Sequence, residues 1–227
     1  MVKNEINNRV KQKVKKGSRN ASSRRWLERQ LNDPYVKAAK DKGYRSRAAF
    51  KLIEIDAKYK IFKNKNSVLD LGGAPGGWSQ ISANRILKNK KGKVISLDLQ
   101  EMEPIEGVLF IKGNILDDVI KDTIERELGN KVDIVLSDMA PSASGHKNTD
   151  QMRSILLAEM ALDTAIYFLN TEGNFCCKLI RGKGEEELVS KMKKYFKLVK
   201  RYKPSSSRKD SAEIFIIGLN FIHQDLA

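Results

Sequence analysis

Apolar runs and helix-like segments alternate along most of this chain, and their order predicts the fold. Strands are expected at 67–71, 93–98, 108–111, 132–138, 173–180, 197–202 and 213–220, and helices at about 77–88, 116–128, 151–169 and 184–195. The strand runs are apolar on both faces, as in buried parallel strands. The alternation predicts an α/β fold, a doubly wound Rossmann-like sheet of seven strands with helices on both faces.

The last strand should run against its neighbours. Only the short segment 203–212 joins it to the preceding strand. A parallel crossover needs a dozen or more residues, usually including a helix. We therefore expect the final strand to be antiparallel.

The first residues differ from the rest. Residues 1–30 are rich in lysine and arginine, and the first twenty lack a sustained apolar period, so we expect a flexible basic extension. Residues 31–227 are expected to form a single domain. Pro34 suits the first turn of a helix after Asn32-Asp33, and Arg45 to Tyr59 has helical spacing.

A glycine-rich turn, Gly72 to Gly77, follows the first expected strand and Asp70. No lysine follows the glycines, which disfavours a P-loop, and the spacing only approximates the dinucleotide pattern G-x-G-x-x-G. S-adenosylmethionine remains. Asp70 could face its cationic amino-acid part, and Asp98 ends the second strand, where carboxylates accept bonds from ribose hydroxyls. The alternatives are a helix N-terminus or turn partner for Asp70 and a strand-end cap for Asp98.

A charged residue interrupts one of the core strands. Lys178 lies in the apolar run 173–180, and lysine is almost never fully buried without a partner. Asp138 ends the strand before it, and Glu213 begins the antiparallel strand. All three should therefore meet at the sheet edge where open α/β sheets bind ligands. The alternative is a lysine that reaches solvent at a strand end.

Charge and cysteine content bound the partners and compartment. Lysine and arginine number 43 against 28 acidic residues, a net charge of +15. The excess favours a nucleic acid partner, with a generally basic surface as the alternative. Cys176 and Cys177 are expected to be core residues in a reducing compartment. No run suits a membrane helix, no secretory signal is visible and no metal-site spacing occurs, so we expect a cytoplasmic monomer without a metal.

Five motifs in order extend this picture. They are Ser23-Arg24-Arg25-Trp26-Leu27, Arg45-Ser46-Arg47-Ala48-Ala49-Phe50-Lys51-Leu52, Asp70 to Gln80, Ser137-Asp138-Met139-Ala140-Pro141 and Lys203-Pro204-Ser205-Ser206-Ser207-Arg208. From about Ser22 to Asn220 the chain resembles the FtsJ family (also called RrmJ or RlmE), the ribosomal RNA large-subunit 2′-O-ribose methyltransferases.

The resemblance implies a catalytic tetrad. Its members fall on Lys51, Asp138, Lys178 and Glu213. The implied reaction is in-line attack of a ribose 2′-hydroxyl on the methyl group of S-adenosylmethionine, without a metal. Lys178 would be the general base, Asp138 and Lys51 would position it, and Glu213 would hold the hydroxyl or Lys178. Without the resemblance, Lys51 would be assigned to a basic helix face.

Binding residues are implied as well. The expected cofactor site comprises Asp70, Gly72, Gly76, Gly77, Trp78, Asp98, Asn114 and Asp138, and the expected RNA contacts are Arg45, Arg47, Lys203 and Arg208. Asn114 departs from the acid that the family commonly has near the adenine, although its amide oxygen can still accept a hydrogen bond.

The expected substrate is a uridine in large-subunit (23S) ribosomal RNA, within the large ribosomal subunit. A transfer RNA substrate and a non-catalytic RNA-binding module of the same fold are the alternatives. A nicotinamide-dependent dehydrogenase is disfavoured by the glycine spacing.

Overall fold

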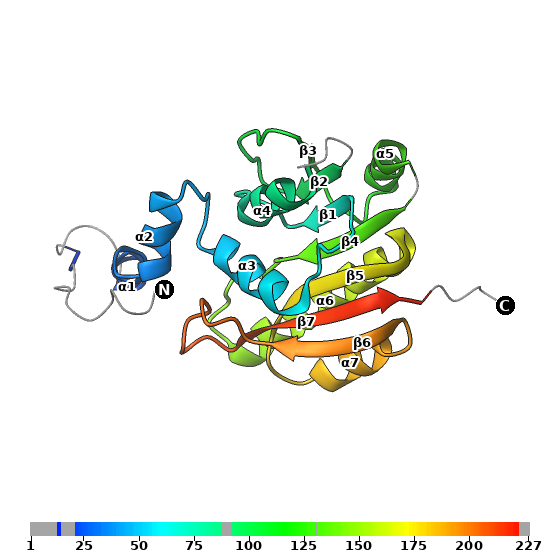
Figure 1. Cartoon of the computed structure of the whole chain (residues 1–227). Helices are drawn as coiled ribbons and strands as arrows, with labels where there is room; N and C mark the ends of the chain where they lie inside the picture. Colours follow the sequence, from blue (N-terminus) through cyan, green and yellow to red (C-terminus); the bar gives the residue numbers. More distant parts are fainter. Residues whose placement is uncertain (1–12, 15–20, 88–91, 130, 223–227) are drawn as a thin grey trace.

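A seven-stranded sheet forms the centre of the molecule (Figure 1), with the strand order β3-β2-β1-β4-β5-β7-β6. The computed structural model describes residues 13–14, 21–87, 92–129 and 131–222. The strands are β1 (Ser67–Leu71), β2 (Lys93–Asp98), β3 (Val108–Lys112), β4 (Val132–Ser137), β5 (Leu169–Ile180), β6 (Phe196–Tyr202) and β7 (Glu213–Phe221). The helices are α1 (Ala21–Leu31), α2 (Pro34–Asp41), α3 (Ala48–Tyr59), α4 (Gly77–Ile86), α5 (Asp118–Leu128), α6 (Lys147–Phe168) and α7 (Glu185–Met192).

Strand direction confirms the expected fold. Strands β1 to β5 pair in parallel, whereas β7 is antiparallel to both β5 and β6. β7 lies between these two strands, so the start of β7 lies at the edge of the sheet where the parallel strands end. Strand β5 begins at Leu169, four residues earlier than the apolar run, because its pairing with β4 continues past a register irregularity.

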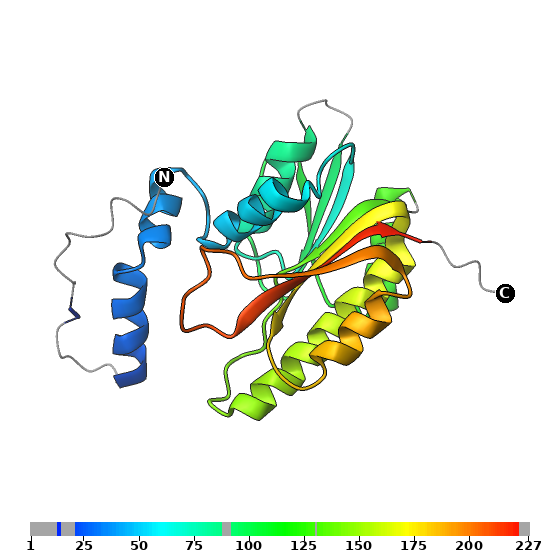
Figure 2. The same ribbon diagram turned by 60° about the horizontal axis from the view of Figure 1, so that its bottom comes forward.

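Helices cover both faces of the sheet (Figure 2). Helices α3 and α4 pack on one face, where their apolar side chains join a core with Val68, Leu136 and Cys176. Helices α5, α6 and α7 cover the other face, with a core that includes Leu69, Val135 and Cys177. Neighbouring strand residues thus point to opposite cores, and both cysteines are buried and free, as expected.

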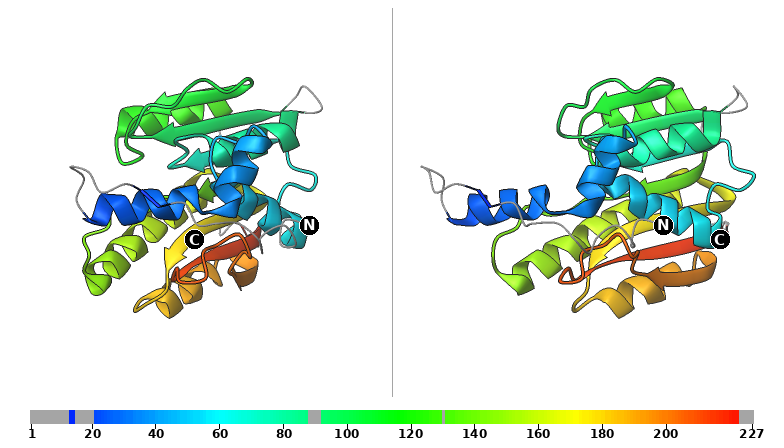
Figure 3. Two further views of the ribbon diagram at one scale, coloured as in Figure 1. Left: turned by 90° about the vertical axis from the view of Figure 1, so that its left-hand side faces the viewer. Right: turned by 60° about the vertical axis from the view of Figure 1, so that its left-hand side comes forward.

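The N-terminal part contains a helix that the sequence analysis did not predict. Residues 21–30 of the expected extension belong to α1, which ends at Leu31, whereas residues 1–12 and 15–20 lie outside the described residues. Helix α2 begins at Pro34 as predicted, and the Asp33 carboxylate caps it by accepting the Tyr35 N–H at 3.0 Å. Both helices lie beside the sheet edge where the parallel strands end (Figures 1 and 3).

The turn before α3 packs closely against the start of α4. A Cβ on Gly77 would lie 2.2 Å from Ser46 Oγ. The Trp78 indole N–H donates to the Ala48 carbonyl at 3.0 Å, and the Trp78 side chain is buried. These contacts fix the glycine loop relative to α3. Within the described residues, no helix is long and apolar enough to span a membrane.

Gly77→Ala should destabilise the protein by about 1–3 kcal/mol, although alanine favours helices, because its Cβ would overlap Ser46 Oγ. The double variant Gly77→Ala with Ser46→Ala should recover most of this loss, since the Ser46 Cβ is 3.4 Å away and its hydroxyl has no hydrogen-bond partner among the described residues. Urea unfolding of both variants, with Ser46→Ala as control, measures the difference. Equal loss in the single and double variants would contradict this explanation.

Candidate active site

The charged strand residues Asp70 and Lys178 lie on the α3/α4 face of the sheet, toward the edge where the parallel strands end. Residues two apart on a strand point to the same face of the sheet. Asp70 therefore points to the same face as Val68, and Lys178 to the same face as Cys176. Lys178 is paired in register with Phe215 of β7, and Ile180 with Glu213. The antiparallel strand thus brings Glu213 to the same edge, as the sequence predicted.

Lys178 forms the first of two ion pairs. Its Nζ lies 2.9 Å from Asp138 Oδ1 and also donates to the Asp138 backbone carbonyl. The side chains are 11% and 17% exposed, respectively. Lys178 is therefore an almost buried cation that is paired with the residue immediately after β4.

Lys51 and Glu213 form the second ion pair. Lys51 Nζ lies 2.7 Å from Glu213 Oε1, and the Ser207 hydroxyl donates to the same oxygen at 2.7 Å. Burial alone would raise the pKa of Glu213, but the Lys51 ammonium, the Ser207 hydroxyl and the Lys178 ammonium together hold this pKa below its ordinary value. Glu213 is thus stabilised as a carboxylate.

Two aromatic rings lie beside the Lys51–Glu213 ion pair. Lys51 Nζ lies 5.6 Å from the centroid of the Phe215 ring, and Trp78 packs against the same ring at a centroid distance of 5.5 Å. The structure therefore brings together all four residues expected in the tetrad. No sequence period identified Lys51; its helix packs on the sheet and directs it to β7.

The glycine loop is held closely between β1 and α4. Gly72 has a φ of +71°, and a Cβ there would lie 2.5 Å from Met139 Cγ. The N–H groups of Gly72 and Gly73 both donate to the Leu97 carbonyl. Gly76 has a φ of +106° and is the N-cap residue of α4, whose first N–H groups lack partners within the helix. Only glycine fits this path without strain.

Asp98 supports the loop from the end of β2. One carboxylate oxygen accepts the Ala74 N–H at 2.9 Å, and the other accepts the Gln100 N–H at 2.9 Å. Asn114, after β3, uses its amide oxygen similarly, accepting the Leu116 N–H at 3.1 Å. Both side chains are partly exposed, and both organise a turn at the sheet edge.

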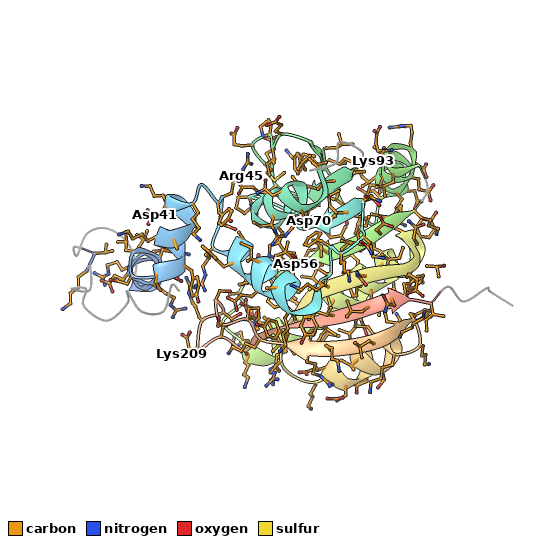
Figure 4. All side chains as sticks on the ribbon, in the orientation of Figure 1. Asp41, Arg45, Asp56, Asp70, Lys93 and Lys209 are labelled. Atoms are coloured by element: carbon orange, nitrogen blue, oxygen red, sulfur yellow. The ribbon has the colours of Figure 1, made fainter. Side chains whose placement is uncertain are left out.

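Two of the expected cofactor residues have side chains inside the protein. Asp70 is fully buried below the loop (Figure 4), where it accepts the Ser79 hydroxyl at 2.6 Å. Trp78 is 2% exposed, and its N–H is bonded to α3. The sequence pattern predicted the strand that carries Asp70 and the helix that carries Trp78, but it did not predict that the glycine loop covers both side chains. Their side chains support the loop from below, and the Ser79 partner of Asp70 lies in the first turn of α4.

Burial changes the ionisation of Asp70. Desolvation, together with the nearby carboxylates of Asp138 and Asp98, raises its pKa to about 7 against the lowering effect of the Ser79 hydroxyl. The other oxygen, Oδ1, has no hydrogen-bond partner among the described residues. The loop therefore rests on a carboxyl group that is poorly solvated when charged.

A large cavity of about 700 Å³ opens beside the loop. Its lining residues are Arg45, Pro75, Glu101, Met102, Glu103 and Pro104. The segment after Asp98 supplies most of this wall, and the sequence analysis did not identify it, although its place after the second strand was a usable signal. A volume of this size is in the range of small-molecule sites.

The four expected RNA-binding residues separate into three places. The Arg45 guanidinium donates to the carbonyls of Glu103 and Pro104 and so lines the large cavity (Figure 4). Lys203 donates to the carbonyl of Ser211 at 2.6 Å within its own loop. Only Arg47 and Arg208 lie together, and both are bound to Asp33.

Arg47 and Arg208 contribute to a second, smaller cavity of about 240 Å³, which we call the arginine cavity. It is lined by Arg29, Arg47, Lys51, Arg208, Asp210, Ser211 and Glu213. This cavity borders the Lys51–Glu213 ion pair. Arg29 comes from α1, the helix that the sequence analysis did not predict. Among the described residues, no group of three or more His, Cys, Asp or Glu side chains could hold a metal ion.

The model of the FtsJ-like methyltransferase family matches residues 44–221. This chain belongs to that family. The matched segment begins just before α3 and ends with β7, so it contains the whole sheet and both ion pairs. The FtsJ-like resemblance of the sequence motifs is thereby confirmed.

Curated relatives extend the family match along the chain. The ribosomal RNA large subunit methyltransferase E of Rickettsia bellii is 50% identical over 206 residues, covering 89% of this chain and 90% of the relative. The protein of the same name from Ehrlichia chaffeensis is 48% identical over 201 residues, covering 88% and 94%, respectively.

Solved structures share the fold. The crystal structure of a ribosomal RNA methyltransferase, putative, from Plasmodium falciparum has a TM-score of 0.71 and 34% identity, over 80% of this chain and all of that one. Human methyltransferase-like protein 13, solved in complex with SAH, has a TM-score of 0.51 and 12% identity, over 79% of this chain and 82% of that one. The latter likeness concerns the fold alone.

Asp70→Asn should change how stability depends on pH. The folded-state pKa of Asp70 is raised, so its stabilising contribution is full below the ordinary value of 3.8 and is lost as the pH rises through about 7. Asparagine cannot ionise, yet it still accepts the Ser79 hydroxyl. Between about pH 5 and about pH 8 the variant should therefore gain stability relative to the wild type.

Urea unfolding across this pH range measures the Asp70 effect. Asp118→Asn is the control, because Asp118 is 93% exposed on α5 and loses the same charge. A difference in unfolding free energy between Asp70→Asn and wild type that stays constant with pH would refute the assignment.

Proposed function

We propose that this chain methylates the ribose 2′-hydroxyl of a uridine in large-subunit (23S) ribosomal RNA, with S-adenosylmethionine as methyl donor. The observation that carries the proposal is the meeting of the ion pairs Lys178–Asp138 and Lys51–Glu213 beside the glycine loop. The names of the curated relatives, ribosomal RNA large subunit methyltransferase E, support the choice of RNA.

The residues around the large cavity fit S-adenosylmethionine. Gly76 borders this cavity closely, because a Cβ there would lie within about 3 Å of Met102, Ile105 and Arg45. The N–H groups at the start of α4 and the carboxylate of Asp98 offer donors and acceptors for a ligand with a carboxylate and ribose hydroxyls. Asp98 oxygens can accept more bonds than the one backbone N–H that each accepts. Asn114 would border the adenine.

S-adenosylmethionine, when bound, supplies a methyl group that is already activated by its sulfonium, so the protein's task is to orient the attacking hydroxyl. In the proposed mechanism Lys178 would first give up its extra proton, and its Nζ would then accept the proton of the 2′-hydroxyl as the hydroxyl oxygen displaces the sulfur from the methyl carbon. Asp138 holds Lys178 through its carboxylate and its carbonyl. Lys51 and Glu213 hold the ribose, with Ser207 fixing Glu213. Positioning of this kind supplies much of the acceleration.

Charge supports a polyanionic substrate. The chain has a net charge of +15, and RNA binding driven by such charge weakens steeply with salt. Arg47 and Arg208 lie beside the Lys51–Glu213 pair, which is where the phosphates next to the acceptor ribose would be. Arg45, in contrast, is proposed to support the cofactor cavity.

Lys178→Met should abolish most methyl transfer. A general base contributes roughly 10²–10⁴-fold to a rate, and methionine keeps the length of the side chain without its amine. The assay follows labelled methyl transfer to ribosomal subunits, free ribosomal RNA and transfer RNA. Cofactor affinity, measured by calorimetry, should stay within about twofold of wild type.

Lys191→Met is the matched control. Lys191 also forms an ion pair, with Asp163 at 2.7 Å, but it lies on α7. It should transfer methyl like the wild type. Equal activity of both variants would eliminate Lys178 as the base. Transfer only to transfer RNA would replace the proposed substrate, and a wild type that binds RNA without any transfer would favour the non-catalytic module.

A further inference from the structure

The arginine cavity holds more positive charge than its own acids compensate. Arg47 and Arg208 both contact the same oxygen, Asp33 Oδ2, so one carboxylate serves two guanidinium groups. Asp33 is buried at 6% side-chain exposure, while the arginines are 15% and 28% exposed. Asp33 therefore fixes the two arginines from behind and leaves one positive charge without a counter-ion.

The two arginines also retain unused donors. Arg47 Nε and Arg208 Nη2 have no hydrogen-bond acceptor among the described residues. Burial lowers the pKa of Arg47, against the effect of Asp33, and the positive charge of Arg208 lowers it further. An anion in this cavity would relieve the charge repulsion between the two guanidinium groups.

Helix α1 adds a third arginine at the cavity mouth. Arg29 Nη2 lies 3.9 Å from Asp210 Oδ2, and the side chains are 57% and 71% exposed. An exposed pair at this distance contributes little to stability. Arg29 can therefore exchange Asp210 for a stronger anion. Figure 2 shows the loop before β7, which carries Asp210, extending toward α1 and α2.

We propose that the arginine cavity is a phosphate subsite, in which Arg29, Arg47 and Arg208 bind one phosphodiester group of the RNA next to the acceptor ribose. The proposal rests on the function proposed above. Guanidinium groups bind phosphate oxygens in pairs, and about 240 Å³ lies below the roughly 300–1,000 Å³ of sites for whole ligands, so a single group fits. Helix α1 thereby belongs to the substrate site.

Opposite charge changes at the mouth should have opposite effects on RNA affinity. The probe is a fluorescein-labelled oligouridylate of about twelve nucleotides, a length that single-strand sites cover, bound to the full-length chain. Arg29→Ala should weaken binding about tenfold, as the loss of a charge-assisted bond predicts, and lower the salt slope by about one. Asp210→Asn should tighten binding.

Matched variants on α5 separate this contact from overall charge. Arg126→Ala and Asp118→Asn make the same charge changes at exposed positions of the opposite face. Both should shift binding much less than their counterparts. Oligouridylate with neutral methylphosphonate linkages should bind wild type and Arg29→Ala alike. Thermal melting should show that the exposed Arg29→Ala variant folds as the wild type does.

Equal affinities of Arg29→Ala and Arg126→Ala would overturn the subsite. Because binding is measured without methyl transfer, this result is independent of activity. A wild type that methylates RNA without any Arg29 effect would refute the subsite alone. An Arg29 effect in a chain that methylates no RNA would uphold the phosphate contact and refute the proposed function.

Discussion

Strand β7 runs against its neighbours because the short segment 203–212 is too short for a parallel crossover. That reversal brings the first residue of β7, Glu213, to the edge where β4 and β5 end. A parallel β7 would have placed Glu213 at the opposite edge, far from Lys178. The Lys51–Glu213 ion pair, its position beside Lys178 and the arginine cavity depend on this one change of direction.

The fold and much of the charged cluster followed from the sequence because strand physics is simple. An apolar run gives a strand, the period of two gives its face, and the short connection gives its direction. These rules alone brought Asp138, Lys178 and Glu213 together. Lys51 required the family resemblance, since helical spacing does not say which strand a helix crosses.

The structure differs from the sequence-based expectation where residues close in sequence bind different partners. Arg45 and Arg47 are two residues apart, yet one binds carbonyls beside the large cavity and the other binds Asp33. They belong to a turn, and a turn has no regular repeat from which the directions of its side chains could be predicted. Asp33 was expected only near a helix start. It also binds two arginines that come from other segments of the chain, Arg47 and Arg208.

Trp78 connects the two halves of the site mechanically. Its indole is bonded to Ala48 on α3 and packs on Phe215 of β7, while its backbone lies in the first turn of α4, directly after the glycine loop. The spacing between loop and tetrad is therefore set by a rigid aromatic ring inside the core. As a consequence, a smaller side chain at position 78 would leave the glycine loop and the tetrad without a common support, and the distance over which the methyl group travels would no longer be fixed.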